Sequence, residues 1–175
     1  MSSSMDRENA ESIRFAVGEC SLGAVVVAAS AKGICAILLG DDAAAAVGDL
    51  RNRFPEAQPI GDGQGFEQVM AKVVGFIEAP GTRFDLPLDP RGTIFQRRVW
   101  KALCQIPAGS TATYSEIARR LGAPKEAYLV GEACAANPIA VVIPCHRVVH
   151  KDGTLAGYRW GFKRKRALLQ REAAA

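Results

Sequence analysis

Three short apolar runs, each followed by a turn, occupy the beginning of the chain. The runs have the length of β-strands and cover residues 13–20, 24–29 and 34–39. Segments that contain Ser and Gly separate them, and such segments are typical of turns. The pattern therefore predicts three consecutive strands of one small sheet.

Two helices are expected after these strands. Residues 43–54 are rich in alanine and follow two aspartates, which favour the positive end of a helix. Residues 66–77 place apolar side chains on one stripe, as an amphipathic helix does. The Pro- and Gly-rich residues 79–91 are expected to link the two halves of the chain, with a short strand near residues 84–88.

Two capping boxes indicate where helices begin in the second half. Thr93 is followed by Gln96, and Thr113 is followed by Glu116. In such a pair, each side chain accepts a hydrogen bond from a backbone N–H that the first helical turn leaves free. We therefore expect one helix directly after each threonine.

A helix-turn-helix is predicted at the second capping box. The helix after Thr113 is expected to stop at Gly122, and Pro124 is expected to begin another helix that runs to Ala136. An outer stripe of the second helix is formed by Tyr128, Gly131, Glu132 and Ala135. Its small residues allow close approach, either to another helix or to a DNA groove.

The charge of the chain is divided unevenly between its halves. Residues 1–90 carry seven Lys/Arg and thirteen Asp/Glu, a net charge of −6, whereas residues 91–175 carry fifteen and five, a net charge of +10. A solvated surface would explain a single basic run, but so large an excess favours a nucleic acid partner. The expected fold is α/β, in the α+β sense: residues 1–88 form a small three-stranded sheet with helices, and residues 89–175 form a mainly helical domain with the helix-turn-helix.

The number and spacing of the cysteines and histidines argue against a disulfide framework and against a metal site. Five cysteines at irregular spacing do not form the framework of a disulfide-rich secreted protein, and the only two histidines are His146 and His150. No CxxC pair is present, so we expect no metal site. Nothing resembles a signal peptide and no apolar stretch is long enough to cross a bilayer, so we expect a cytoplasmic protein that makes no membrane contact. We also expect a monomer.

One cysteine stands in a context that suggests chemistry. Residues 139–143 form a continuous apolar run, expected as a buried strand or extended segment, and lead into Pro144, Cys145, His146 and Arg147. A lone cysteine there would more often belong to the core. Positive neighbours, however, lower the pKa of a thiol, and His146 can act as a general base.

The last predicted helix, residues 163–172, carries the one carboxylate that could orient this histidine. Leu168, Leu169 and Glu172 share one side of it by their spacing. Glu172 could therefore point inward towards His146, but an exposed glutamate near the end of the chain fits the spacing as well and is favoured by it alone.

The segments IPCHRVVHKDGTLAGYRWG and ACAAN resemble the active-site signature of the O6-alkylguanine-DNA alkyltransferases, or methylated-DNA–protein-cysteine methyltransferases. The resemblance continues through GTIFQRRVWKALCQIPAGSTATYSEIA and GICAILLGDD and covers the chain from about Phe15 onward. Within the family, the sequence most resembles the C-terminal half of the bacterial adaptive-response protein Ada. The resemblance implies DNA repair without a cofactor: one alkyl group passes irreversibly from O6-alkylguanine in double-stranded DNA to Cys145.

The resemblance also implies a role for each matching residue. His146 deprotonates Cys145 through a bridging water, and Glu172 orients His146. Asn137 matches the hinge of the recognition helix, and Tyr114 helps to turn the damaged nucleotide out of the duplex. The backbone of Cys145 and Val148 reads the guanine edge. The further expected substrate or DNA contacts are Tyr128, Gly131, Ala135, Arg147, Tyr158, Arg159 and Trp160.

The sequence departs from the family pattern on the recognition helix. Family members carry an arginine where Tyr128 stands, and Glu126 and Glu132 add negative charge to the same helix. Trp160 is expected to narrow the pocket. We therefore expect weak duplex binding with an intact thiol. The alternatives are an engineered self-labelling protein and a non-repair DNA-binding lesion sensor.

Overall fold

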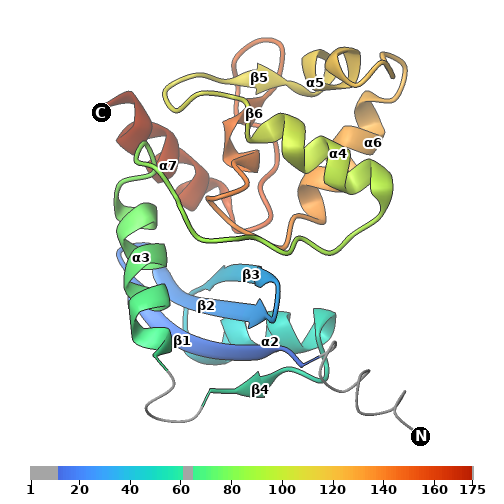
Figure 1. The fold of residues 1–175 in the computed structure, drawn as a ribbon. Coiled ribbons are helices and arrows are strands. Elements are labelled where there is room, and N and C mark those ends of the chain that lie inside the picture. The colour runs from blue at the N-terminus through green and yellow to red at the C-terminus, as the bar shows by residue number, and fades with distance from the viewer. Residues whose placement is uncertain (1–11, 61–64, 175) are drawn as a thin grey trace, which may run out of the picture.

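The computed structural model describes residues 12–60 and 65–174, and its first half is built around one sheet (Figure 1). The sheet has the order β3-β2-β1-β4, with antiparallel pairing of the first three strands in the chain and parallel pairing of β4 with β1. Its strands are β1 (Arg14–Cys20), β2 (Gly23–Ser30), β3 (Gly33–Gly40) and β4 (Gln58–Pro59). The three predicted strands are confirmed. The prediction missed β4, because a two-residue strand has no periodicity.

The predicted strand at residues 84–88 is wrong. Only a single bridge joins Ile34 to Leu88 there. The backbone N–H of Ile34 donates to the carbonyl of Pro87, and Asp89 donates back to the Ile34 carbonyl. Pro87 itself has no N–H, so the ladder cannot continue. The segment is thus tied to the edge of β3 without forming a strand.

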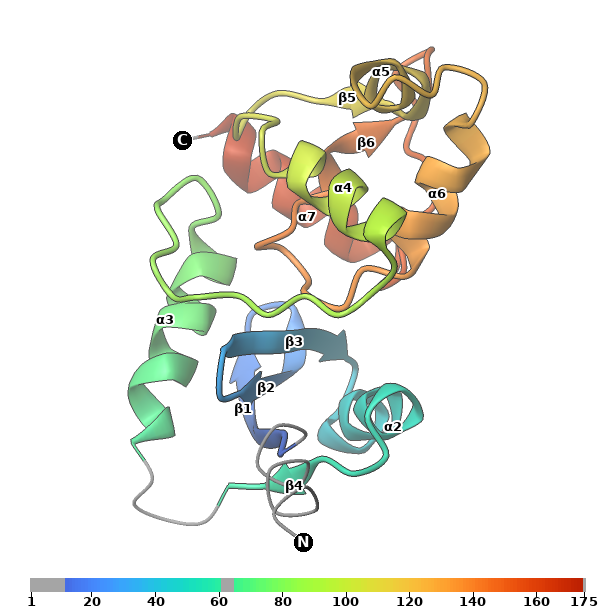
Figure 2. The same ribbon diagram turned by 45° about the vertical axis from the view of Figure 1, so that its right-hand side comes forward.

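Both predicted helices are present, and they pack on the sheet. Helix α2 (Ala43–Arg53) packs on β2 and β3, and α3 (Phe66–Glu78) packs along β1. The side chain of Asp42 accepts a hydrogen bond from the N–H of Ala45 at 2.8 Å and caps α2. In Figures 1 and 2 the linker from α3 runs past the sheet to the helices of the second half.

The second half is mainly helical, and both capping boxes are present. Helix α6 begins at Ala127, three residues later than predicted, because Pro124 lies in the turn before it. The elements are α4 (Ile94–Leu103), β5 (Ala112–Thr113), α5 (Tyr114–Arg120), α6 (Ala127–Ala135), the 3₁₀ turn η1 (Cys145–Arg147), β6 (Val148–Val149) and α7 (Phe162–Ala173). Helices α5 and α6 pack on each other and form the predicted helix-turn-helix.

The apolar run before Cys145 is buried, as predicted, but it is a series of turns rather than a strand. Val141 has a φ of 69°, a left-handed conformation that a β-branched residue rarely adopts. Only Ile139 forms a bridge, to Ile37 of β3. The run is therefore held by the first half of the chain and not by a sheet of its own.

The described residues share one continuous hydrophobic core, and none of their helices is long and apolar enough to cross a membrane. A domain boundary between residues 88 and 89 stays a prediction.

Candidate active site and nucleic-acid interface

Cys145 lies at the start of η1 and is 4% exposed. The side chain of Asn137, which is fully buried, donates to the Cys145 sulfur at 3.2 Å and to the Ile143 carbonyl at 2.9 Å. Its oxygen accepts from the N–H of Ile139 at 2.9 Å. One amide side chain thus fixes the turns before the cysteine and contacts the sulfur itself.

Burial governs the protonation of the thiol. It raises the pKa of Cys145 to about 11, although the hydrogen bond from Asn137 and the charge of Lys165 act in the opposite direction. At neutral pH the resting thiol is therefore protonated. A reaction at the sulfur requires a base nearby.

His146 and Glu172 form a buried pair. The Nε2 atom of His146 lies 2.5 Å from Oε1 of Glu172, and the two residues are 0% and 4% exposed. Burial lowers the pKa of His146 below its ordinary value and outweighs the nearby carboxylate. Burial raises the pKa of Glu172, but hydrogen bonds from His146 and Arg147 prevail, so the net direction is down.

These charge states fix the tautomer of the imidazole. An ionised carboxylate is only an acceptor, so Nε2 of His146 carries the proton and donates it to Glu172. The other nitrogen, Nδ1, is left with a free lone pair. It is buried and has no hydrogen-bond partner among the residues that the structure describes. His146 is thus a neutral base whose basic nitrogen is available.

Arg147 does not reach the surface where a substrate or DNA contact was expected. Its Nε donates to both oxygens of Glu172, at 3.1 and 2.9 Å, and its Nη1 donates to the carbonyl of Ile106 at 2.6 Å. The side chain is 8% exposed. The structure therefore corrects the expectation: Arg147 holds the carboxylate that holds the histidine.

Lys165 belongs to this buried cluster and was missed by the sequence analysis. It is fully buried, and its ammonium group donates to the carbonyls of Val148 and Ala156, at 2.5 and 3.1 Å. The basic run around it looks like a solvated face. The usable signal was spacing, because positions 165, 168 and 172 lie on one side of α7, the side that is buried.

An aromatic pair lies beside the cluster, in the loop before α7. The rings of Tyr158 and Trp160 are arranged edge to face, with their centroids 5.4 Å apart, and Tyr158 also faces His146 edge-on at 6.5 Å. The Tyr158 hydroxyl and the Trp160 Nε1 are buried, and no other described residue hydrogen-bonds to them. Buried polar groups are usually paired, so these two groups are exceptions among the described residues.

Arg159, between the two aromatic residues, makes several contacts within the protein. Its guanidinium donates to the carbonyl of Asn137 at 2.9 Å and to Asp49 of α2 at 2.7 Å. It also lies over the Trp160 ring, 5.2 Å from the centroid. The structure therefore places Arg159 in a contact between the two halves of the chain.

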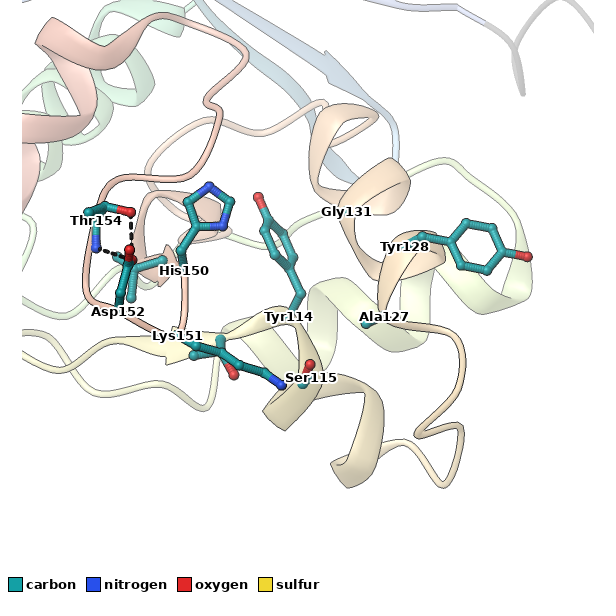
Figure 3. A pocket seen from close by; sticks show the side chains of 11 residues that line it. Tyr114, Ser115, Ala127, Tyr128, Gly131, His150, Lys151, Asp152 and Thr154 are labelled. Atoms are coloured by element: carbon teal, nitrogen blue, oxygen red, sulfur yellow. Dashed lines mark hydrogen bonds between the residues drawn. The ribbon is translucent and has the colours of Figure 1, made fainter.

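An open groove of about 780 Å³ lies between α6 and the loop after β6 (Figure 3). Tyr114, at the start of α5, faces His150 edge-on across it, with the ring centroids 6.4 Å apart. Gly131 lies in the wall, and an added Cβ there would meet the Tyr114 ring at 3.9 Å. That distance is an ordinary van der Waals contact, so α6 already lies one side-chain contact away from this ring.

Tyr128 lines the outer edge of this groove. It is 68% exposed, and its ring points away from Tyr114 and His150 in Figure 3. Glu132 and Ala135 are also exposed on α6, as the stripe predicts. Val148, in contrast, is fully buried; its N–H donates to the Cys145 carbonyl, and its own carbonyl accepts from Lys165.

The fold and the site together define a helix-turn-helix protein that contains a buried thiol, imidazole and carboxylate. Comparison with known proteins names the family. The family described as "6-O-methylguanine DNA methyltransferase, DNA binding domain" matches residues 94–174. The chain belongs to the methylated-DNA–protein-cysteine methyltransferase family, as the sequence resemblance predicts.

Individual relatives agree with this assignment. The bifunctional transcriptional activator/DNA repair enzyme Ada of Escherichia coli K12 is 49% identical over 92% of this chain and 46% of its own length. The inducible methylated-DNA–protein-cysteine methyltransferase of Bacillus subtilis 168 is 41% identical over 71% of this chain and 70% of its own. The chain thus spans about half the length of the Ada relatives.

A solved structure extends the likeness to both halves. OGT of Mycobacterium tuberculosis, in complex with DNA, matches 93% of this chain and 92% of its own, with a TM-score of 0.76 and 37% identity. The likeness therefore includes the sheet of the first half as well as the helix-turn-helix.

Proposed function

We propose that the protein repairs DNA by transferring an alkyl group from O6-alkylguanine to Cys145, once per molecule. The observation that carries this proposal is the buried His146–Glu172 pair: it leaves Nδ1 of His146 with a free lone pair, and the preceding residue is a cysteine that is protonated at rest. The names of its relatives, methylated-DNA–protein-cysteine methyltransferase among them, agree with this chemistry.

The proposed reaction is an in-line displacement. His146 takes the thiol proton through a bridging water, and the thiolate attacks the alkyl carbon. The sulfur–carbon bond forms as the bond from that carbon to guanine O6 breaks; the guanine anion takes up a proton from water, and the imidazolium returns the thiol proton to water. Glu172 stabilises the imidazolium that forms during the transfer. The thioether product is stable to the groups in this site, so the reaction stops after one turnover and needs no cofactor.

The groove beside α6 is the proposed DNA interface. The target carbon cannot be reached inside a stacked duplex, so the nucleotide must turn out. Tyr114 lies between the groove and the cysteine region, and burial raises its pKa to about 12, so it stays a neutral hydrogen-bond donor. Gly131 and Ala135 let α6 approach the minor groove.

Tyr158 and Trp160 are the proposed pocket wall. Their unpaired polar groups would bind the polar edge of the flipped base. The backbone carbonyls of Cys145 and Val148, which accept from Val148 and Lys165, would each accept a second hydrogen bond from that edge. By its relationship to bacterial repair proteins, we place this activity in the cytoplasm.

The test is the intact mass of the protein after it is mixed with duplex DNA that contains O6-methylguanine. One methyl group in place of a thiol hydrogen adds about 14 Da, and peptide mapping should locate it on Cys145. Repeated turnover with substoichiometric protein would contradict the mechanism. Binding to the lesion with no change of mass would instead identify a lesion sensor.

A further inference from the structure

The segment of residues 136–140, which includes Asn137, is hydrogen-bonded by two elements of the first half of the chain, β3 and α2. On one side, Ile37 of β3 donates to the carbonyl of Pro138 and accepts from the N–H of Ala140, each at 2.9 Å. On the other side, arginine side chains approach the two preceding carbonyls. Four backbone groups around Asn137 are thus fixed by partners from outside the segment.

The arginine contacts converge on one turn of α2. Arg53 of α2 donates to the carbonyl of Ala136 at 2.5 Å, and Arg159 donates to the carbonyl of Asn137 at 2.9 Å. Asp49, one turn before Arg53, binds the same Arg159 guanidinium at 2.7 Å. Ala136 caps the C-terminal end of α6 and Asn137 follows it, so this cluster holds the backbone directly after the recognition helix.

The side chains of this cluster are partly buried and do not form an exposed contact on the surface. The side chains of Arg159 and Asp49 are 19% and 33% exposed. Burial and the neighbouring positive charge of Arg159 both lower the pKa of Arg53. Two arginines are therefore kept side by side at a cost, with one carboxylate between them. Such an arrangement is retained most readily where position matters.

Asn137 connects this cluster to the reacting sulfur. Its backbone carbonyl is held by Arg159, and its side chain donates to Cys145 at 3.2 Å. A shift of residues 136–137 would therefore move the amide away from the sulfur. The same arginine packs over Trp160 in the aromatic pair, so the pocket wall would move as well.

We propose that Asp49, Arg53 and Arg159 form a clamp by which α2 positions Asn137, and through it Cys145, for transfer. The three are positioning residues, since none of them touches the sulfur. The inference rests on the function proposed above, and it adds that the first half of the chain sets the rate of the chemical step. A displacement of about 1 Å can slow a reaction by as much as 10²-fold.

The test compares Asp49→Ala with Asp41→Ala, using the full chain. Asp41 makes an ion pair of the same length, 2.7 Å, with Arg164 of α7, but it does not contact residues 136–140. We expect Asp49→Ala to lower the limiting rate of single-turnover transfer roughly tenfold, with duplex affinity unchanged. Asp41→Ala should react as the wild type does. Asp49→Asn keeps an oxygen that can accept from Arg159, so it should restore most of the rate.

A second measurement does not depend on transfer. Hydrogen exchange of the Ile139 and Ala140 amides reports whether the segment has been released, because these amides donate to Asn137 and to Ile37. We expect faster exchange in Asp49→Ala and not in Asp41→Ala. Equal exchange, or equal limiting rates, in the two variants would overturn the clamp. A wild type that transfers nothing would refute the proposed function, while the exchange result would still decide on the clamp.

Discussion

The buried cluster around Cys145 and the outer face of α6 belong to the same half of the molecule but differ in how deeply their side chains are buried. In the cluster, Arg147, Lys165 and Glu172 are all engaged by side chains or carbonyls. On the outer face of α6, Tyr128 projects into solvent.

The difference indicates that the two proposed tasks, chemistry at Cys145 and DNA contact through α6, depend on separate sets of residues. Removal of one partner from a buried ion pair typically costs about 3–5 kcal/mol, so the cluster tolerates little change. Substitutions at exposed positions away from such features usually change stability by within about 0.5 kcal/mol. Tyr128 can therefore depart from the family pattern without disturbing the site that would perform the chemistry.

The largest expected effect is the loss of the nucleophile. Cys145→Ala should abolish transfer and keep DNA binding, because the groove beside α6 does not include this residue. The measurement is the mass of the protein after it is mixed with methylated duplex, alongside a gel-shift titration. Cys104→Ala is the control, since Cys104 is an exposed free thiol. Transfer by the Cys145→Ala protein would show that the cluster is not the reacting site.

The next effect concerns the base. His146→Ala and Glu172→Gln should slow transfer by roughly 10²–10⁴-fold, as is typical when a general base is lost, with duplex affinity nearly unchanged. Thermal unfolding must accompany the Glu172 variant, because Arg147 loses its carboxylate too. If Glu172→Gln transfers at the wild-type rate, Glu172 has a structural role and does not support the base.

The pH dependence of the transfer rate distinguishes the two bases that can generate the thiolate, His146 and hydroxide. Burial raises the pKa of Cys145 to about 11 and keeps that of His146 below its ordinary value of 6.5. In the wild type His146 is neutral from pH 7 upward, so the rate with free O6-benzylguanine should be flat between about pH 7 and 9. In His146→Ala only hydroxide generates the thiolate, so the rate should rise roughly tenfold per pH unit up to about pH 11. Equal slopes would mean that His146 is not the base.

Those parts of the fold that depend on local sequence could be predicted. The three strands, both capping boxes and the helices follow from neighbouring residues. The turns at residues 139–143 could not be predicted in this way, because their hydrogen-bond partners lie on β3, some hundred residues earlier. A continuous apolar run shows that a segment is buried, but it does not show which groups form hydrogen bonds with the backbone of that segment.

The same division applies to the site. Cys145 and His146 stand in a motif, but the inward position of Glu172 followed only from the family resemblance, since its spacing favoured an exposed side chain. Arg159 is paired with Asp49 across 110 positions, and no local pattern reveals a contact of that separation. A long-range contact thus holds Arg159 between the two halves of the chain, and a substrate or DNA contact by this residue stays a prediction.

Trp160 lies at the border between the two regions, and a smaller effect is expected there. Trp160→Gly should speed the reaction with O6-benzylguanine by roughly tenfold relative to methylated DNA, because the pocket widens for the larger group. The side chain is 5% exposed and supports Arg159, so thermal stability should fall. Trp160→Phe, which keeps most of the volume, is the control. Equal acceleration with both substrates would show that Trp160 acts on the loop and not on the width of the pocket.

The smallest effect is expected at Tyr128, where the comparison between the two regions is tested most directly. A tyrosine can wedge between bases, but it lacks the charge and the forked donors of an arginine. Glu132, one turn further on, repels phosphates. Tyr128→Arg should therefore raise the rate on methylated duplex roughly fivefold, since an exposed charge contact contributes up to about 1 kcal/mol. The rate with a free O6-alkylguanine base should not change.

Ile94→Arg is the matched control for Tyr128→Arg, because Ile94 is 73% exposed and Tyr128 is 68% exposed. Both variants add the same charge to a basic protein, but only Tyr128 lines the groove beside α6. A gain confined to Tyr128→Arg, and to duplex DNA, would show that the outer face of α6 limits repair while the buried cluster is fully competent. An equal gain from Ile94→Arg would assign the effect to overall charge. A slower duplex reaction in Tyr128→Arg would show that tyrosine is the working wedge of this protein, and that the outer face of α6 is adapted rather than impaired.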